Sequence, residues 1–227
     1  MKHLKRYVNV AINKDYMDIQ KYAFRKYKIK TIENAHTHLA PEELRRLEKL
    51  QLTGNDMKLQ TTLDAFLFCC YAGLRYSDFV SLKPENFIVL NKEIWLMYKS
   101  IKTKTEVRLP LYLLFDSKGI SILEKYMDNL SAFFKLRDNS NINKELIKIS
   151  KLSGISKHIS FHTARHTNAT LLIYSGVNIT TVQKLLGHKS IKTTQVYTDI
   201  MDMTIIRDLE KCTENTSNRR VSSGNVC

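Results

Sequence analysis

A chain of 227 residues, 43% hydrophobic and 26% charged, can bury one sizeable core or two small ones and has the composition of an ordinary globular protein. No apolar run approaches the ~18 residues of a membrane span and no signal segment is visible, so we expect a cytoplasmic protein that makes no membrane contact. The four cysteines have neither zinc-site nor disulfide-framework spacing; they are Cys69, Cys70, Cys212 and Cys227.

The net charge of +14 comes from 36 basic and 22 acidic residues and favours a polyanionic partner. A solvated basic surface would explain the total equally well. The charge is clustered, however, because the first 30 residues hold nine Lys or Arg and only two Asp. This clustering favours nucleic acid over a merely solvated surface.

The basic N-terminal segment contains two predicted parts. Residues 1–16 have the apolar spacing of an amphipathic helix. Residues 20–37 have no clean period and predict a linker that lies over a polyanion, with Arg25 and Lys30 as candidate DNA contacts. A further helix is predicted at residues 41–51, where a proline and two glutamates occupy the first turn.

The central part of the chain predicts a buried helix followed by a small sheet. Residues 57–73 are strongly apolar and end at a glycine, and a short helix follows at residues 77–82. Three short runs rich in β-forming residues then alternate with polar turns, at residues 87–90, 94–98 and 107–111. We therefore predict a mainly α fold with a small three-stranded antiparallel sheet.

The C-terminal half predicts helices again. They are expected at residues 120–134, 144–152, 162–174, 179–186 and 203–211, with one further turn of helix at Tyr197. Residues 213–227 are polar and are expected to be disordered.

The stretch from residue 161 to 197 holds four groups suited to phosphate-ester chemistry, which are His162, Arg165, His188 and Tyr197. His162 and Arg165 are three residues apart, so they share one face of the predicted helix. A guanidinium fork binds two phosphate oxygens, a histidine moves a proton near neutral pH, and a tyrosine hydroxyl can act as a nucleophile.

Two more basic groups belong with this stretch. Arg75 directly follows a helix end, where its burial would be costly unless an acid or a ligand oxygen met it. Lys102 lies in the turn between two predicted strands, flanked by Lys99 and Lys104. We expect the two flanking lysines to contact DNA.

These residues lie in five motifs that occur in a fixed order: AGLRYSD, IKTKTEVRLPL, HTARHT, LLGHKS and TTQVY. Together they resemble the catalytic domain of tyrosine recombinases, and within that family the integrases of phages and conjugative transposons. The resemblance covers about residues 40–210. It implies the tyrosine-recombinase catalytic-domain fold and assigns the family's catalytic positions to Arg75, Lys102, His162, Arg165, His188 and Tyr197.

The resemblance also implies a mechanism. Tyr197 would attack a DNA phosphodiester, forming a 3′-phosphotyrosine and releasing a 5′-hydroxyl. The two arginines would hold the non-bridging oxygens, and His188 would donate a hydrogen bond to the phosphate. His162 would take the tyrosine proton, and Lys102 would protonate the leaving oxygen. The covalent link conserves the bond energy, so no cofactor, metal or ATP is needed.

Several of these residues also have an ordinary structural explanation. Most tyrosines are packing residues with a wet hydroxyl. His188 could cap a helix end, Arg75 could pair with Asp78 or Glu85, and we assign His166 to structure. All such explanations would have to coincide in family order, so we prefer the functional interpretation.

A zinc site is a separate alternative, since His162 and His166 have i, i+4 spacing and His188 could be a third ligand. However, Thr163 stands where a metalloprotease helix carries its glutamate. Arg165 between the two histidines would also repel a cation. We therefore expect no metal.

The domain organisation follows from the resemblance. Residues 1–40 would be the last helix of a core-binding domain with its basic linker, 41–212 the catalytic domain, and 213–227 a tail. The core-binding domain would then be largely missing, and the chain would be a fragment. Family members act as tetramers on double-stranded DNA, and the helix at 203–211 could dock on a neighbouring subunit or on its own.

Three functions stay open at this point. The first is a site-specific DNA recombinase or integrase of a mobile element. The second is a nicking and rejoining enzyme of the type IB topoisomerase kind. The third is a non-catalytic DNA-binding regulator, against which the complete set of six residues counts. The DNA target, the direction of reaction and the accessory factors cannot be read from the sequence.

Overall fold

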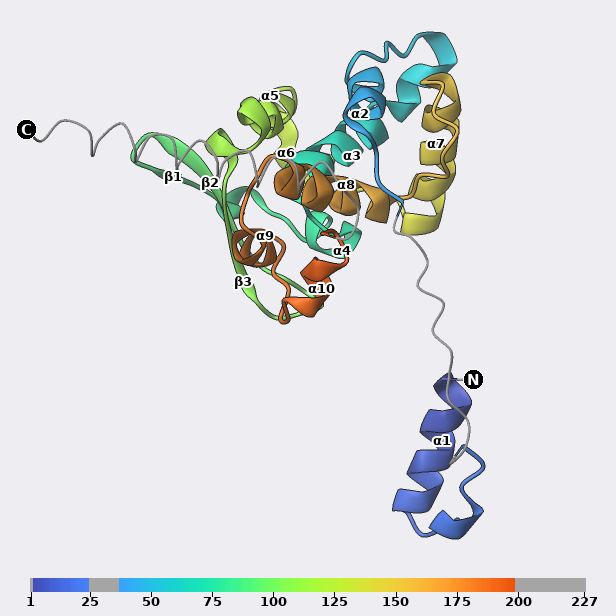
Figure 1. Ribbon diagram of the computed structural model, residues 1–227. Coiled ribbons are helices and arrows are strands. Elements are labelled where there is room, and N and C mark those ends of the chain that lie inside the picture. The colour runs from blue at the N-terminus through green and yellow to red at the C-terminus, as the bar shows by residue number, and fades with distance from the viewer. Residues whose placement is uncertain (1, 25–36, 199–227) are drawn as a thin grey trace, which may run out of the picture. The chain divides into compact units, whose positions relative to one another are not determined.

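The computed structural model describes residues 2–24 and 37–198 and divides the chain into two units, residues 1–35 and 36–227 (Figure 1). Arg25 and Lys30, as well as the predicted helix at 203–211 and the tail at 213–227, lie outside the described residues.

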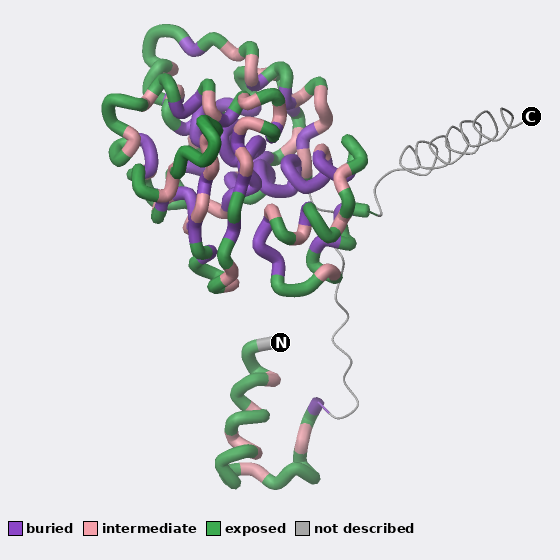
Figure 2. Tube along the Cα trace, turned by 90° about the vertical axis from the view of Figure 1, so that its left-hand side faces the viewer, coloured by how far each residue is buried: buried purple, intermediate pink, exposed green. Residues whose placement is uncertain are grey.

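The first unit holds α1 (Lys2–Asn13) and a 3₁₀ turn, η1 (Ile19–Lys21). The predicted amphipathic helix is thus confirmed. None of the described side chains of α1 is buried, and Tyr7 is 71% exposed (Figure 2). Leu4 and Val10 are exposed as well, whereas Val8, Ala11 and Ile12 are partly buried, so the apolar residues of α1 are only partly covered within this unit.

The second unit is built around two buried helices, α3 (Gln60–Ala72) and α8 (Phe161–Tyr174), which pack against each other. Every residue of α3 from position 62 to 72 is buried, and α8 is buried along most of its length (Figure 2). A helix that is apolar on all sides must be covered on all sides. This requirement explains why the other helices of the unit surround this pair.

The surrounding helices complete the core. Against α3 pack α2 (Pro41–Glu48), α5 (Lys118–Glu124) and α7 (Asn139–Leu152), and α7 also contacts α8. The remaining helices are α4 (Tyr76–Phe79), α6 (Leu130–Phe133), α9 (Ile179–Leu185) and α10 (Lys192–Gln195). Helix α9 contacts both α8 and the sheet, and α10 contacts α9.

The predicted three-stranded antiparallel sheet is present, with strand order β1-β2-β3 (Figure 1). Its strands are β1 (Phe87–Leu90), β2 (Glu93–Lys99) and β3 (Glu106–Pro110). Lys99 pairs with Glu106 at the end of the second ladder, so residues 100–105 form the hairpin turn. The turn bears Lys102 and Lys104, both exposed.

Several predicted helices differ from the observed ones at their ends, since α2 and α4 end about three residues early and α3 begins only at Gln60. Two differ more. The single helix expected at 120–134 is broken into α5 and α6, because Asn129 caps a new start by accepting a hydrogen bond from the Ala132 N–H at 3.0 Å. Helix α7 begins at Asn139, well before position 144, because the Asp138 carboxylate caps its first turn. Short polar side chains of this kind compete for backbone N–H groups and so define helix starts. Across residues 2–24 and 37–198, no helix has the length and apolar character needed to cross a bilayer.

Candidate active site

Arg75 is held between α4 and the hairpin turn. Its Nη1 lies 3.2 Å from the Ser100 hydroxyl and 3.5 Å from a carboxylate oxygen of Asp78. Asp78 is fully buried, and its other oxygen accepts a hydrogen bond from the Ile101 N–H at 2.8 Å. The same carboxylate therefore orients the arginine and fixes the turn that carries Lys102. From the sequence, Asp78 was expected only as an ion-pair partner, and this second function was missed.

Arg165 is buried, with 1% of its surface exposed. Its guanidinium donates to the backbone carbonyl of Gly73 at 2.7 Å and to that of Leu186 at 2.5 Å. Burial, followed by the nearby charge of Arg75, lowers the pKa of Arg165 to about 10. The side chain stays charged at neutral pH, and two fixed acceptors hold it in one orientation.

Gly73 makes the Arg165 contact geometrically feasible. It ends α3 in the left-handed conformation at φ +68°, where non-glycine residues are strained. A Cβ at this position would lie 2.6 Å from the side-chain oxygen of Asn168. Asn168 in turn donates to the carbonyls of Cys70 and Tyr71, both at 2.9 Å, so it caps the end of α3. The end of α3 is thus tied to α8 on both sides of the arginine.

His188 follows the turn that ends α9 and is buried. Its Nδ1 lies 2.9 Å from the Thr194 hydroxyl of α10. Burial first, and then the positive charges of Arg165, Arg75, His162 and Lys102, lowers the pKa of His188 to about 3. This histidine is therefore neutral at physiological pH. These four electrostatic neighbours are all residues that were expected at the site from the sequence.

Tyr197 lies just after α10 and is 5% exposed. Burial raises the pKa of its phenol above the ordinary value, and the nearby charges of Arg165 and Arg75 oppose that rise. The hydroxyl lies 2.9 Å from Nδ1 of His166. Electrostatic coupling thus connects His188 with four of the other residues expected from the sequence, and Tyr197 with the two arginines.

His166 has a contact that its sequence position did not predict. We expected a purely structural side chain, but its ring contacts Tyr197 and lies edge-on to the His162 ring, with 4.5 Å between ring centroids. The signal that could have revealed this contact was the i, i+4 spacing of the two histidines. That spacing was considered only as zinc-ligand spacing. In the described part of the chain, no group of three or more His, Cys, Asp or Glu side chains is arranged to hold a metal ion.

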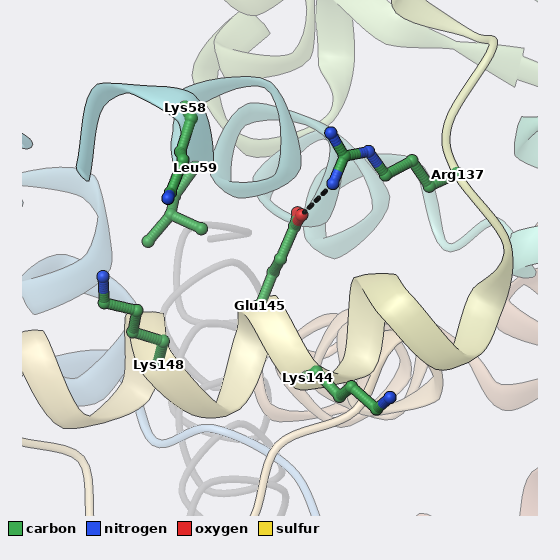
Figure 3. Close-up of a pocket in the computed structure, with 6 residues that line it drawn as sticks. All are labelled: Lys58, Leu59, Arg137, Lys144, Glu145 and Lys148. Carbon is green, nitrogen blue, oxygen red and sulfur yellow. Dashed lines mark ion pairs between the residues drawn. The ribbon is translucent and has the colours of Figure 1, made fainter. Parts of the chain in front are cut away.

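A separate hollow of about 420 Å³ has a basic lining (Figure 3). Its lining residues are Lys58, Leu59, Arg137, Lys144, Glu145 and Lys148. Arg137 and Lys148 are engaged in ion pairs with Glu145 and Asp56, respectively. None of the six predicted site residues lines it.

The chain is similar to known proteins over most of its length. The model of the phage integrase family matches residues 37–203. This match covers most of the chain, so the chain belongs to the phage integrase family.

Curated relatives include tyrosine recombinase XerC of Rickettsia prowazekii, 31% identical over 170 residues, which represent 72% of this chain and 54% of the relative. Tyrosine recombinase XerC of Rickettsia bellii is 30% identical over 176 residues, 70% of this chain and 54% of the relative. The chain spans about half the length of the curated relatives it matches.

Solved structures share the fold. A lambda integrase tetramer bound to a Holliday junction matches with a TM-score of 0.66 at 18% identity, covering 86% of this chain and 56% of the other. XerA recombinase matches with a TM-score of 0.60 at 21% identity, covering 92% of this chain and 82% of the other. The Tn1549 transposon integrase in complex with circular intermediate DNA matches with a TM-score of 0.63 at 19% identity, covering 86% of this chain and 72% of the other. The fold is therefore that of the tyrosine-recombinase catalytic domain.

Proposed function

We propose that this chain carries the catalytic domain of a site-specific DNA recombinase or integrase of a mobile element, which cleaves and rejoins DNA through a 3′-phosphotyrosine. The observation that supports this best is that two oriented arginines, Arg165 and Arg75, act electrostatically on the buried Tyr197 phenol. A nucleophilic oxygen next to two guanidinium groups is suited to attack a phosphodiester, because the guanidiniums can bind its oxygens.

In this mechanism the basic side chains of the protein stabilise the negative charge that develops on the phosphate. Arg165 and Arg75, each held by protein acceptors, bind the non-bridging oxygens without reorganising. His188 is neutral, and when its Nδ1 accepts the Thr194 hydroxyl hydrogen its own hydrogen is on Nε2, from which it can be donated to a phosphate oxygen. Lys102 on the exposed hairpin turn protonates the leaving 5′ oxygen.

Double-stranded DNA is the proposed substrate, and a tetramer on DNA the proposed active form. The net charge of +14 and the exposed lysines Lys99, Lys102 and Lys104 support DNA binding. Related solved structures are complexes with DNA, including a lambda integrase tetramer bound to a Holliday junction. We propose that the segment at 203–211 links subunits; the sequence alone left open whether it docks on a neighbouring subunit or on its own.

The domain assignment is likewise a proposal. We take residues 41–212 as the catalytic domain and residues 1–40 as the last helix and linker of a core-binding domain. The exposed apolar side chains of α1 support this assignment, because an amphipathic helix normally packs its apolar face against other helices.

The test is capture of a covalent adduct on suicide DNA. A pool of duplexes with randomised sequence before a nick lets the short 5′-hydroxyl product diffuse away, so cleaved complexes accumulate. The wild-type chain should form an adduct that survives denaturation, and Tyr197→Phe should form none. Sequencing the captured strands separates a recombinase, which enriches one site, from a topoisomerase-like enzyme, which enriches none. A regulator would bind the pool without any adduct.

A further inference from the structure

We propose that the two histidines of α8 divide their tasks, with His166 receiving the proton of Tyr197 and His162 facing the phosphate. This inference rests on the proposed function and deepens it, because it names the general base. The resemblance assigned that task to His162.

The hydrogen bond identifies His166. Its Nδ1 lies 2.9 Å from the Tyr197 hydroxyl, within the range at which a general base takes a proton directly. Both partners are buried, at 8% and 5% exposure, so bulk water does not compete for this hydrogen bond. A buried phenol with a raised pKa needs such an acceptor to become a nucleophile near neutral pH.

The position of the held hydroxyl is suited to attack. Arg165 and Arg75 both act electrostatically on the Tyr197 phenol, so His166 holds this oxygen beside the two groups that bind the phosphate. His166 therefore holds the Tyr197 hydroxyl within the electrostatic influence of the two arginines that we propose bind the phosphate.

His162 has a different neighbour. Its positive charge contributes to the lowered pKa of His188, together with the charges of Arg165, Arg75 and Lys102. It therefore faces the cationic group around the phosphate position. The His162 and His166 rings are in edge-on contact, with 4.5 Å between their centroids, so the two histidines to which we assign these tasks lie one helical turn apart.

The proton balance closes with these assignments. The Oη–H bond of Tyr197 breaks and its hydrogen forms an N–H bond at Nδ1 of His166. The phenolic oxygen bonds to phosphorus, the bond from phosphorus to the 5′ oxygen breaks, and that oxygen takes a proton from Lys102. On rejoining, each of these transfers is reversed. The described neighbours of His166 include His162 on its own helix and Tyr197 from the segment after α10.

The experiment measures the rate of adduct formation against pH in four chains: wild type, His166→Asn, His162→Asn and His158→Asn. The Asn side chain places an amide oxygen close to where Nδ1 was, so it can still accept a hydrogen bond but cannot take a proton. His166→Asn should slow the reaction by roughly 10²–10⁴-fold and remove the acid limb of the profile. His162→Asn should also slow adduct formation, but its pH profile should retain the acid limb. The exposed His158 provides the matched control and should behave as wild type.

A second measurement detects the hydrogen bond without DNA. In protein labelled at tyrosine Cζ with ¹³C, the Tyr197 resonance is identified by its loss in Tyr197→Phe. His166→Leu should shift this resonance, whereas His158→Asn should not, and thermal melting confirms that each variant folds. An unshifted resonance overturns the inference, as does His166→Asn with the wild-type rate and pH profile. Absence of any wild-type adduct overturns the proposed function and this inference together.

Discussion

Individual side chains in the site are tuned by burial more than by single ion pairs. His188 is the clearest case, because burial and four neighbouring cations bring its pKa to about 3. A histidine in this state donates a hydrogen bond as a neutral imidazole. A bound phosphodiester would add a negative charge to the same region and so favour the protonated form.

This shift predicts how stability depends on pH. Between about pH 6.5 and pH 3, His188 is neutral in the folded chain and charged in the unfolded chain, so the unfolded state binds more protons. The free energy of unfolding should therefore fall as the pH falls through this range, by up to about 1.4 kcal/mol per pH unit from this group. Urea unfolding at several pH values measures this dependence of the free energy of unfolding on pH.

His188→Gln provides the comparison, because glutamine does not titrate. Its free energy of unfolding should fall less steeply with falling pH over the same range than that of wild type. Equal slopes in the two chains would show that His188 titrates normally in the folded state.

The sequence predicted the residues of the site better than their contacts. The ordered motifs single out six side chains, and in the structure His188 is coupled electrostatically to four of the others and Tyr197 to the two arginines; their assignment as the catalytic set stays a prediction. The contact of His166 with Tyr197 was not predicted: the i, i+4 spacing puts both histidines on one face of the helix, but it does not decide which of them faces the segment after α10. The double contact of Asp78 was also missed, since it joins α4 to a turn more than twenty residues away.

At the scale of elements, the end of α3 is the feature on which the arginine depends. Gly73→Ala should destabilise the chain by about 2–5 kcal/mol, combining left-handed strain with a contact of 2.6 Å to Asn168. It should also slow adduct formation, because the Gly73 carbonyl orients Arg165. Chemical denaturation and the adduct assay measure the two effects.

Gly54→Ala is the matched control for this substitution. Gly54 also has a positive φ, +54°, but a Cβ there would meet nothing within 4 Å. The expected cost is the strain alone, about 1–2 kcal/mol, with the adduct rate unchanged. If both variants were destabilised equally, the proposed packing of α3 against α8 at this point would be wrong.

Helices and strands were predicted correctly where the sequence has a clear hydrophobic periodicity or a residue that clearly ends a helix or strand. The sheet, α3 and α8 were predicted closely, because apolar runs bounded by glycine or polar turns define them. The break between α5 and α6 was not, since it depends on the Asn129 side chain capping the backbone, and an asparagine inside an apolar period does not indicate such a cap.

At the scale of the whole molecule, the excess charge predicts salt-sensitive DNA binding. Replacing Lys99, Lys102 and Lys104 by alanine should weaken binding and reduce the slope of log affinity against log salt. The expected reduction is about one unit for each DNA phosphate that is no longer neutralised by a lysine. Titrations at several salt concentrations by fluorescence anisotropy measure this slope.

Lys118→Ala is the control for the hairpin lysines. Lys118 carries the same charge but is ion-paired with Glu48 at 2.9 Å. Its replacement should leave the slope nearly unchanged. A hairpin triple variant with the wild-type slope would exclude this turn from the DNA-binding surface.

The central claim is that Tyr197 forms the covalent bond to DNA. Mass spectrometry of the trapped adduct, after digestion with protease and nuclease, locates the nucleotide on a single peptide. We predict a phosphodiester-linked nucleotide on Tyr197 in the wild-type chain and none on any residue in Tyr197→Phe. A nucleotide on another side chain, or an adduct that persists in Tyr197→Phe, would contradict the proposed function.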